Sequence, residues 1–190
     1  MIEFLQKVTE SYRHNRGFSG VEYSHLLDLR PQDGVPRCYV NEGKSHTGLD
    51  TFAMDIIIPD PKANQLEILA PADGIAGDPI TIHSRKSIDI KDSWAVNTIR
   101  VYVSKSEYYE IKHFEAGSCN LRMNDKVSEG QPIALTGGSG FYTDQNFHHI
   151  HFAVHGINIS NKVTAFPLKV RFKEYNLIYG NNGSVVFAKK

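Results

Sequence analysis

The chain has neither an excess of charge of one sign nor a long apolar run. Its 21 basic side chains balance 21 acidic ones, so no long-range attraction to nucleic acid or to an anionic membrane is expected. No apolar stretch approaches the roughly 18–20 residues that cross a bilayer, which excludes membrane insertion by a helix. The first five residues lack both a basic start and a continuous apolar run, so no signal peptide is expected.

Cysteine is scarce as well. The chain has two, Cys38 and Cys119, and they lack the paired Cys-x-x-Cys spacing of a structural zinc site. A disulfide between them would require Cα atoms about 4.4–6.8 Å apart. The sequence does not give that separation, so one bridge and two free thiols both remain open.

Hydrophobic periodicity is abundant, and most of it has the two-residue repeat of β-strands. Apolar residues at helical spacing predict one short helix over residues 2–14. The expected strands are short and bounded by turn residues, and they span residues 56–58, 67–69, 80–83, 98–103, 108–113, 149–155, 166–172 and 184–187. Because no helix alternates with these strands, the pattern favours a mainly β fold with an antiparallel sheet.

The length suits one domain with a sizeable core and small extensions. We expect an N-terminal segment over residues 1–40 that contains the short helix, and a central domain over residues 41–156. A C-terminal β extension over residues 157–190 is expected to pack on the same domain.

Histidine residues carry the main chemical signal. Alternate side chains of an extended strand share one face, so His149 and His151 point the same way. Together with His46 and Asp55 from upstream, they can supply three ligands to a zinc ion that keeps one coordination position open. One histidine then remains for proton transfer. His155 shares the face but lies roughly 13 Å from His151 along a regular strand, so a structural role is expected for it.

Several segments resemble, in the same order, the lysostaphin/LytM-type zinc endopeptidases, which cut peptide cross-links of bacterial peptidoglycan. The segments that carry the likeness are Ser45-His46-Thr47-Gly48, Phe52-Ala53-Met54-Asp55, Ala70 to Ile75, Tyr109 to Phe114, Asp125 to Ile133, Thr136 to Gly140 and His149-Ile150-His151-Phe152. The resemblance implies an antiparallel β-sheet of the LytM/lysostaphin type that floors an open substrate groove.

The resemblance also implies which residues form the site. It makes His46, Asp55 and His151 the ligands of a Zn²⁺ ion, and it makes His113 and His149 the unligated catalytic pair. Zinc in such a site lowers the pKa of a bound water from about 15.7 to near 7. We expect His149 to accept that water's proton and His113 to donate to the developing oxyanion, but the two roles can be exchanged.

The carboxylate ligand has two candidates. Asp50 lies four positions after His46, as in the compact His-x-x-x-Asp form of the motif. Asp55 lies in the Phe-Ala-Met-Asp context of the longer-spaced form. We favour Asp55, which leaves Asp50 as a loop carboxylate.

These expectations lead to a zinc-dependent endopeptidase that hydrolyses cross-links or stem peptides of peptidoglycan. The alternative is a degenerate LytM-like domain that binds the cell wall or regulates another hydrolase. We expect a monomer whose partners are peptidoglycan peptides, with no nucleic acid and no membrane insertion. Because peptidoglycan lies outside the cytoplasmic membrane, the expected location is periplasmic or extracellular, reached through a secretion or phage system if no signal peptide is used. Whether glycine bridges or D-Ala–diamino-acid links are cut stays open.

Overall fold

The structure is a computed structural model that describes residues 17–26, 38–39, 48–50, 52–57, 66–83, 86–87, 95–137, 139–141, 149–158, 164–179 and 184–190. The expected helix over residues 2–14 and the expected ligand His46 lie outside the described residues. None of the helices in the described ranges has the length and apolar character needed to span a membrane.

Strands dominate the described residues, and one short 3-10 helix, η2, precedes β3. In chain order the elements are β1 (Phe18–Tyr23), β2 (Cys38–Tyr39), η2 (Gly48–Asp50), β3 (Met54–Ile57), β4 (Glu67–Leu69), β5 (Gly74–Ala76), β6 (Lys86–Ser87), β7 (Thr98–Ser104), β8 (Glu107–Lys112), β9 (Lys126–Val127), β10 (Pro132–Leu135), β11 (Gly140–Phe141), β12 (His149–Asn158), β13 (Thr164–Phe172), β14 (Tyr175–Tyr179) and β15 (Ser184–Lys189). The mainly β prediction is confirmed.

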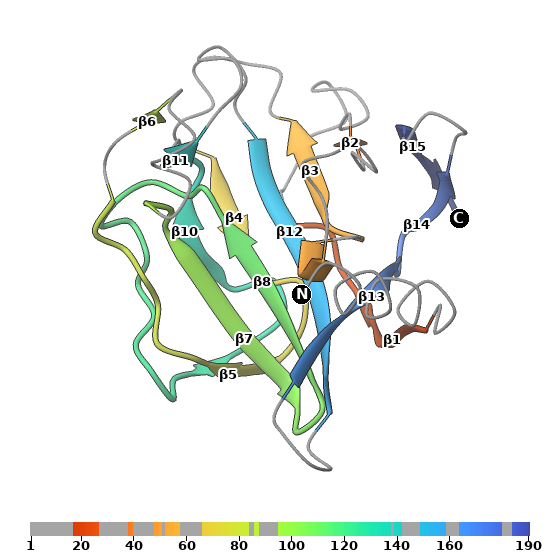
Figure 1. The fold of residues 1–190 in the computed structure, drawn as a ribbon, viewed down its shortest axis with the longest axis horizontal. Helices are drawn as coiled ribbons and strands as arrows, with labels where there is room; N and C mark the ends of the chain where they lie inside the picture. The colour runs from red at the N-terminus through yellow and green to blue at the C-terminus, as the bar shows by residue number, and fades with distance from the viewer. Residues whose placement is uncertain are drawn as a thin grey trace, which may run out of the picture.

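Most of these strands join one sheet around β12 (Figure 1). Its order is β14-β15-β2-β3-β12-β8-β7-β5-β9, and β13 bonds to β12 and to β1. Neighbours along that order are antiparallel. Strands β1 and β13 run parallel instead, as do β6 and β11 in a separate pair. The antiparallel prediction therefore holds for the central strands, while the sheet as a whole is mixed.

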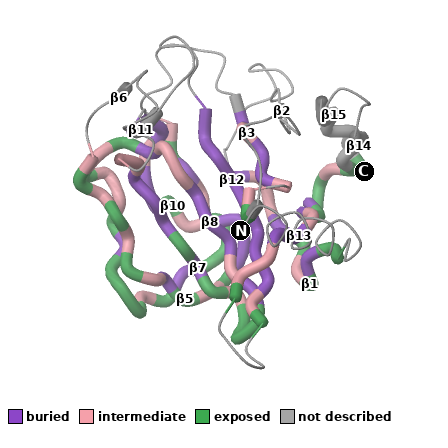
Figure 2. The backbone as a smooth tube through the Cα atoms, in the orientation of Figure 1, coloured by how far each residue is buried: buried purple, intermediate pink, exposed green. Residues whose placement is uncertain are grey.

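Strand β12 forms the centre of the molecule and is buried on both faces. Every residue from His149 to Gly156 is buried, and Figure 2 shows this buried run along the strand. On the core face, the ring of Phe152 lies 5.8 Å from that of Tyr23 and 6.1 Å from that of Tyr109. The two histidines of the His-x-His motif occupy the opposite face, because side chains alternate along a strand.

Strand register places three polar residues side by side on that face. His151 of β12 pairs with Asp55 of β3 on one side and with Lys112 of β8 on the other. Side chains directly opposite each other in an antiparallel pair have Cβ atoms about 4.5–5.5 Å apart. The sheet thus brings together residues that are far apart in the sequence.

The strand expected over residues 80–83 is wrong. Only Ile80 forms a bridge, with Thr98, and residues 81–83 belong to no strand. Ile82 is 81% exposed, so its apolar side chain has no buried face to occupy. Alternation of apolar residues indicates a strand only where a sheet is available to pair with it.

The C-terminal residues extend the main sheet. Strand β13 pairs with the second half of β12, and β15 pairs with β2. Cys119 is a free thiol that packs against the core, and burial raises its pKa. The side chain of Cys38 lies outside the described residues.

Candidate metal and catalytic centre

Three central strands carry the described candidates. His149 and His151 lie at the start of β12, Asp55 lies on β3, and His113 directly follows β8. Strands β3 and β8 flank β12 on either side, so these four side chains converge at one end of the sheet. The fifth candidate, His46, lies outside the described residues.

Short distances join the four described side chains. Nδ1 of His151 lies 3.0 Å from Oδ1 of Asp55, and Nε2 of His149 lies 3.7 Å from the same oxygen. The ring of His113 is 4.7 Å from that of His149 and 6.1 Å from that of His151, centroid to centroid. His149 and His151 are both buried. The predicted catalytic pair and two of the three predicted ligands therefore share one cluster.

His113 has a left-handed backbone conformation, with φ of 70°. This conformation is uncommon for a residue other than glycine, and such outliers concentrate at functional sites. Nδ1 of His113 lies 2.7 Å from the carbonyl oxygen of Ser139. Because a carbonyl only accepts hydrogen bonds, we assign the ring proton to Nδ1, which leaves Nε2 as an acceptor. Burial, and then the neighbouring His149, hold the pKa of His113 well below its usual value.

Two buried polar residues that sequence reasoning missed fix the turn at His113. The backbone carbonyl oxygen of Asn97 accepts a hydrogen bond from the backbone N–H of His113 at 3.1 Å. The side-chain amide of Asn97 donates to the backbone carbonyl of Phe114 at 3.0 Å. The hydroxyl of Ser139 donates to the same carbonyl at 3.2 Å and accepts from the N–H of Asn97 at 3.0 Å. Nothing in the sequence around either residue signals this contact.

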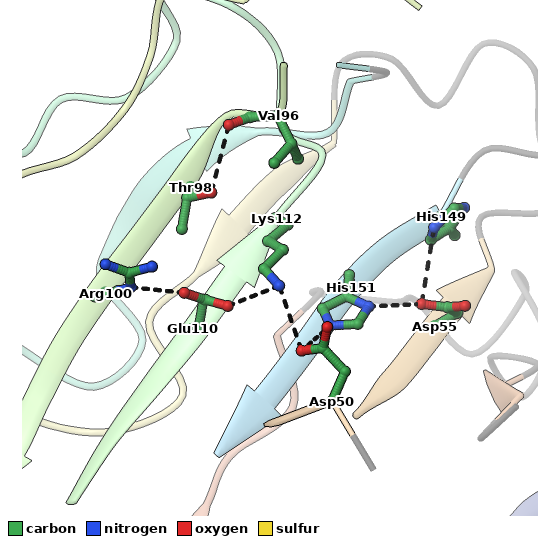
Figure 3. Close-up of polar contacts among 9 residues, drawn as sticks. All are labelled: Asp50, Asp55, Val96, Thr98, Arg100, Glu110, Lys112, His149 and His151. Carbon is green, nitrogen blue, oxygen red and sulfur yellow. Dashed lines mark hydrogen bonds and ion pairs between the residues drawn. The ribbon is translucent and has the colours of Figure 1, made fainter. Parts of the chain in front are cut away.

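Asp50 also contacts the cluster, from the side opposite Asp55. Its Oδ1 lies 3.3 Å from Nε2 of His151 and accepts at 3.3 Å from the ammonium of Lys112. Lys112 in turn donates to Glu110 at 2.9 Å, and Glu110 accepts from Arg100 at 2.6 Å. Figure 3 shows this chain of charged groups running from β7 across β8 to His151. The sequence favours Asp55 over Asp50 as the ligand and so predicts a loop carboxylate at Asp50. In the structure Asp50 ends η2 and contacts His151.

These contacts shift the pKa values of the groups that make them. Burial alone would raise the pKa of Asp50, but its hydrogen bonds to His151 and Lys112 and their positive charges hold it far below the usual value. Burial would lower the pKa of His151, yet its hydrogen bonds to Asp50 and Asp55 raise it. These hydrogen bonds thus favour the anion of Asp50 and the protonated ring of His151.

The described part of the predicted ligand set fits zinc. Zn²⁺ takes imidazole nitrogen and carboxylate oxygen at about 2.0–2.2 Å in tetrahedral geometry, which separates two ligand atoms by about 3.3 Å. The 3.0 Å between Nδ1 of His151 and Oδ1 of Asp55 is close to this value. The 3.3 Å between Nε2 of His151 and Oδ1 of Asp50 matches this value as well, so both carboxylates lie at a separation from His151 compatible with a shared ion.

A second cluster also brings potential metal ligands together. Among the described residues, Asp50, Glu110 and His155 place one ligand atom each within 4.8 Å of one another. The ammonium of Lys112 already contacts both of these carboxylates, so a positive charge is present in this cluster. His155 itself stacks on Tyr108, with ring centroids 4.8 Å apart.

Solved structures with a similar fold include M23 metallopeptidases and the SpoIIQ–SpoIIIAH pore-forming complex. The M23 metalloprotease pseudoalterin from the deep sea has a TM-score of 0.58 and 12% identity, with 90% of this chain and 92% of that one covered. The chain has the M23 metallopeptidase fold. The catalytic domain of lysostaphin from Staphylococcus simulans has a TM-score of 0.41 and 16% identity over 82% of this chain and 92% of that one. The LytU structure has a TM-score of 0.43 and 17% identity over 76% and 79%.

Comparisons of sequence find less. No family model matches the chain, and no curated protein matches it either. At 12% identity the likeness to pseudoalterin shows the fold alone. The chemistry of this chain must therefore be argued from its own residues.

Proposed function

We propose that the chain is a zinc-dependent endopeptidase that hydrolyses cross-links or stem peptides of bacterial peptidoglycan. The observation that carries the proposal is the convergence of Asp55, His113, His149 and His151 from three strands of an M23-type sheet. A shared function is a physical reason for four such side chains to lie together. Burying several imidazoles and a carboxylate together costs stability unless a ligand or a network compensates them.

Asp55, His151 and His46 are the proposed zinc ligands. The first two are supported by the 3.0 Å separation of their donor atoms, and the third by its place in the sequence motif. Bound zinc supplies a water of lowered pKa and polarises the carbonyl of the scissile peptide bond. Zinc also suits the mixed nitrogen and oxygen donors of this set.

His113 is proposed as the proton acceptor. Its Nδ1 proton is held by the Ser139 carbonyl, and burial favours the neutral ring, so Nε2 carries the lone pair that can accept a proton. The same atom then delivers that proton to the amine that leaves. This assignment exchanges the two roles expected from the sequence, where His149 was the acceptor.

His149 then suits the donor role. Its Nε2 lies 3.7 Å from the carboxylate of Asp55, which favours a proton on that ring. An N–H of this imidazole beside the scissile carbonyl would stabilise the negative charge that develops on the carbonyl oxygen. Removal of one such donor typically costs about 3–4 kcal/mol of transition-state stabilisation.

The proposals for the substrate and the place of action rest on the resemblance to the lysostaphin/LytM-type endopeptidases. We propose an extended peptide of small or D-configured residues as substrate, bound by a monomer in the periplasm or outside the cell. The competing proposal is a degenerate domain that binds cell wall without cutting it. The described ligands of the zinc site are all present, which favours the enzyme.

The substitution His151→Ala tests the proposal against its competitor. The wild-type protein should retain one zinc per chain after gentle dialysis and should release soluble peptides from purified sacculi. The variant should lose zinc and peptide release together, because a proposed ligand is gone. Zinc is measured by atomic absorption and the fragments by mass spectrometry.

His155→Phe is the matched control, since it changes a histidine on the same face of the same strand outside the cluster. It should keep both zinc and peptide release at neutral pH. A folded wild-type protein without stoichiometric zinc and inert on sacculi with zinc added would refute the proposed function. Sacculus binding that survives in His151→Ala, with no cleavage by either protein, would support the degenerate domain.

A further inference from the structure

We infer that Asp50 is a positioning residue that fixes His151 through its Nε2 atom, and that the ion pairs of Lys112 with Asp50 and Glu110 hold Asp50 in place. The inference rests on the proposed zinc site. It assigns a role to a carboxylate that the sequence motif offered as a ligand, and to a partly buried chain of charged side chains with no role in the proposed chemistry.

The two nitrogens of the His151 ring meet different carboxylates. Nδ1 faces Asp55 at 3.0 Å, whereas Nε2 faces Asp50 at 3.3 Å. An imidazole that binds a cation through Nδ1 must carry its proton on Nε2. A carboxylate that accepts this proton in a hydrogen bond fixes the tautomer and the ring orientation, and makes the other nitrogen a better ligand.

The position of Asp50 argues against its being a ligand of the same ion. The two nitrogens of an imidazole point in diverging directions, so a cation at Nδ1 of His151 lies away from a group at Nε2. Oδ1 of Asp50 also lies 3.3 Å from the ammonium of Lys112. A second cation on that oxygen would be repelled at short range.

The anchor for Asp50 comes from the sheet. Lys112 pairs with His151 in the register of β8 and β12, so its side chain emerges beside the imidazole. Glu110, whose side chain is 5% exposed, accepts from both Lys112 and Arg100. The ammonium of Lys112 thus lies between the carboxylates of Asp50 and Glu110, and its positive charge compensates the negative charge of Asp50. The cluster of Asp50, Glu110 and His155 is thus held by an ammonium of the protein itself.

The first experiment compares Asp50→Asn with Asp55→Asn in the full chain. Zinc affinity is measured by competition with a chromogenic chelator, and metal geometry by the visible absorption spectrum of the Co²⁺-substituted protein. Asp50→Asn should bind zinc about 10–100-fold more weakly, the usual cost of losing a partner behind a ligand, with an unchanged Co²⁺ spectrum. Asp55→Asn should change the spectrum or lose the metal. Asp78→Asn, at an exposed carboxylate, is the control and should match the wild type.

A second experiment tests the anchor. Lys112→Met should weaken zinc binding less than Asp50→Asn does, again without changing the Co²⁺ spectrum. The double variant Asp50→Asn with Lys112→Met should bind zinc no more weakly than Asp50→Asn alone, because Lys112 acts through Asp50. Thermal unfolding of each apo-protein confirms that the variants compared are folded. Nitrogen-15 NMR of the zinc-loaded wild type should show the His151 proton on Nε2.

Each contrary result identifies a different error. Zinc affinity of Asp50→Asn within twofold of the wild type, or a His151 proton on Nδ1, overturns the positioning role. Loss of zinc from Asp50→Asn as complete as from Asp55→Asn, with an altered Co²⁺ spectrum, makes Asp50 a ligand and also overturns it. A folded wild type that binds no zinc overturns the proposed function itself, and this inference with it.

Discussion

At the scale of the residue, His113 shows how backbone geometry aims a proposed catalytic side chain. His113 directly follows β8 with a φ of 70°, and its ring lies beside those of His149 and His151. A non-glycine residue in this region costs energy that its surroundings must supply. Here the buried hydrogen bonds of Asn97 and Ser139 hold the turn. The strain thus lies at the residue for which the proposed chemistry needs the strictest placement.

His155 controls acid stability in a way that can be measured. It is 1% exposed, and neither of its ring nitrogens has a hydrogen-bond partner among the described residues. Burial lowers its pKa to about 4, although the carboxylate of Glu110 opposes the shift. The unfolded chain therefore takes up a proton as pH falls from about 6.5 to 4, whereas the folded chain does not. As the pH falls over this window, the free energy of unfolding therefore decreases by about 3 kcal/mol because of this residue.

The substitution His155→Phe should reduce the loss of stability between about pH 6.5 and 4. Phenylalanine can keep the stacking on Tyr108 and removes the titrating ring from both folded and unfolded states. Urea unfolding of the wild type and the variant between pH 4 and 7 measures the difference. Stability curves that run parallel over the whole range would show that His155 is not the group responsible.

At the scale of the element, the approach of two loops near β8 depends on Gly137. A Cβ atom at this position would lie 2.2 Å from the backbone nitrogen of Glu115 and 2.4 Å from its Cα. The neighbouring bridge between Phe114 and Thr136 joins the same two segments. Backbone atoms cannot move aside as a side chain can, so only glycine fits.

Gly137→Ala should therefore separate these segments and move the Ser139 carbonyl away from His113. We expect a loss of about 1–3 kcal/mol in the free energy of unfolding and a lower kcat. Gly17→Ala is the control, because its Cβ would meet its nearest atom, on Leu168, at an ordinary 3.5 Å, and it should change stability by less than about 0.5 kcal/mol. Denaturant unfolding and peptide release measure the two effects. Equal stability of the two variants would contradict the close approach.

At the scale of the whole molecule, the proposed zinc site joins strands that are distant in the sequence. Asp55 and His151 come from neighbouring strands of the sheet centre, so a metal that binds both favours the folded state. Saturation at about 100 times Kd adds about 2.7 kcal/mol of stability. For a chain of this size that corresponds to about 5–10 °C in Tm.

Removal of zinc with a chelator should therefore lower Tm by about 5–10 °C, and added zinc should restore it. Calorimetry of the wild type and His151→Ala tests this, because the variant has lost a proposed ligand and its Tm should not respond to zinc. A wild-type Tm that ignores chelation would argue against a zinc site between these strands.

Local patterns predict much of this molecule. Alternation of apolar residues anticipated β7, β8, β12 and β13 closely, because buried faces with a two-residue period depend on local sequence. It failed at residues 80–83, where no neighbouring strand pairs beyond Ile80. Strands β1 and β14 were not predicted; β1 pairs with β13, which lies far away in the chain, whereas β14 pairs with the next strand, β15.

The amino-acid sequence by itself determined that two imidazoles share one face, because the His-x-His spacing places them so in any extended strand. It also determined the mainly β architecture. Only the tertiary structure decided which carboxylate faces which nitrogen of His151, and that His113 carries its proton on Nδ1. Those facts depend on strand register, on a left-handed turn, on the buried partners Asn97 and Ser139, and on the partly buried Lys112. Contacts of this kind are made across strands, and no local pattern of residues encodes them.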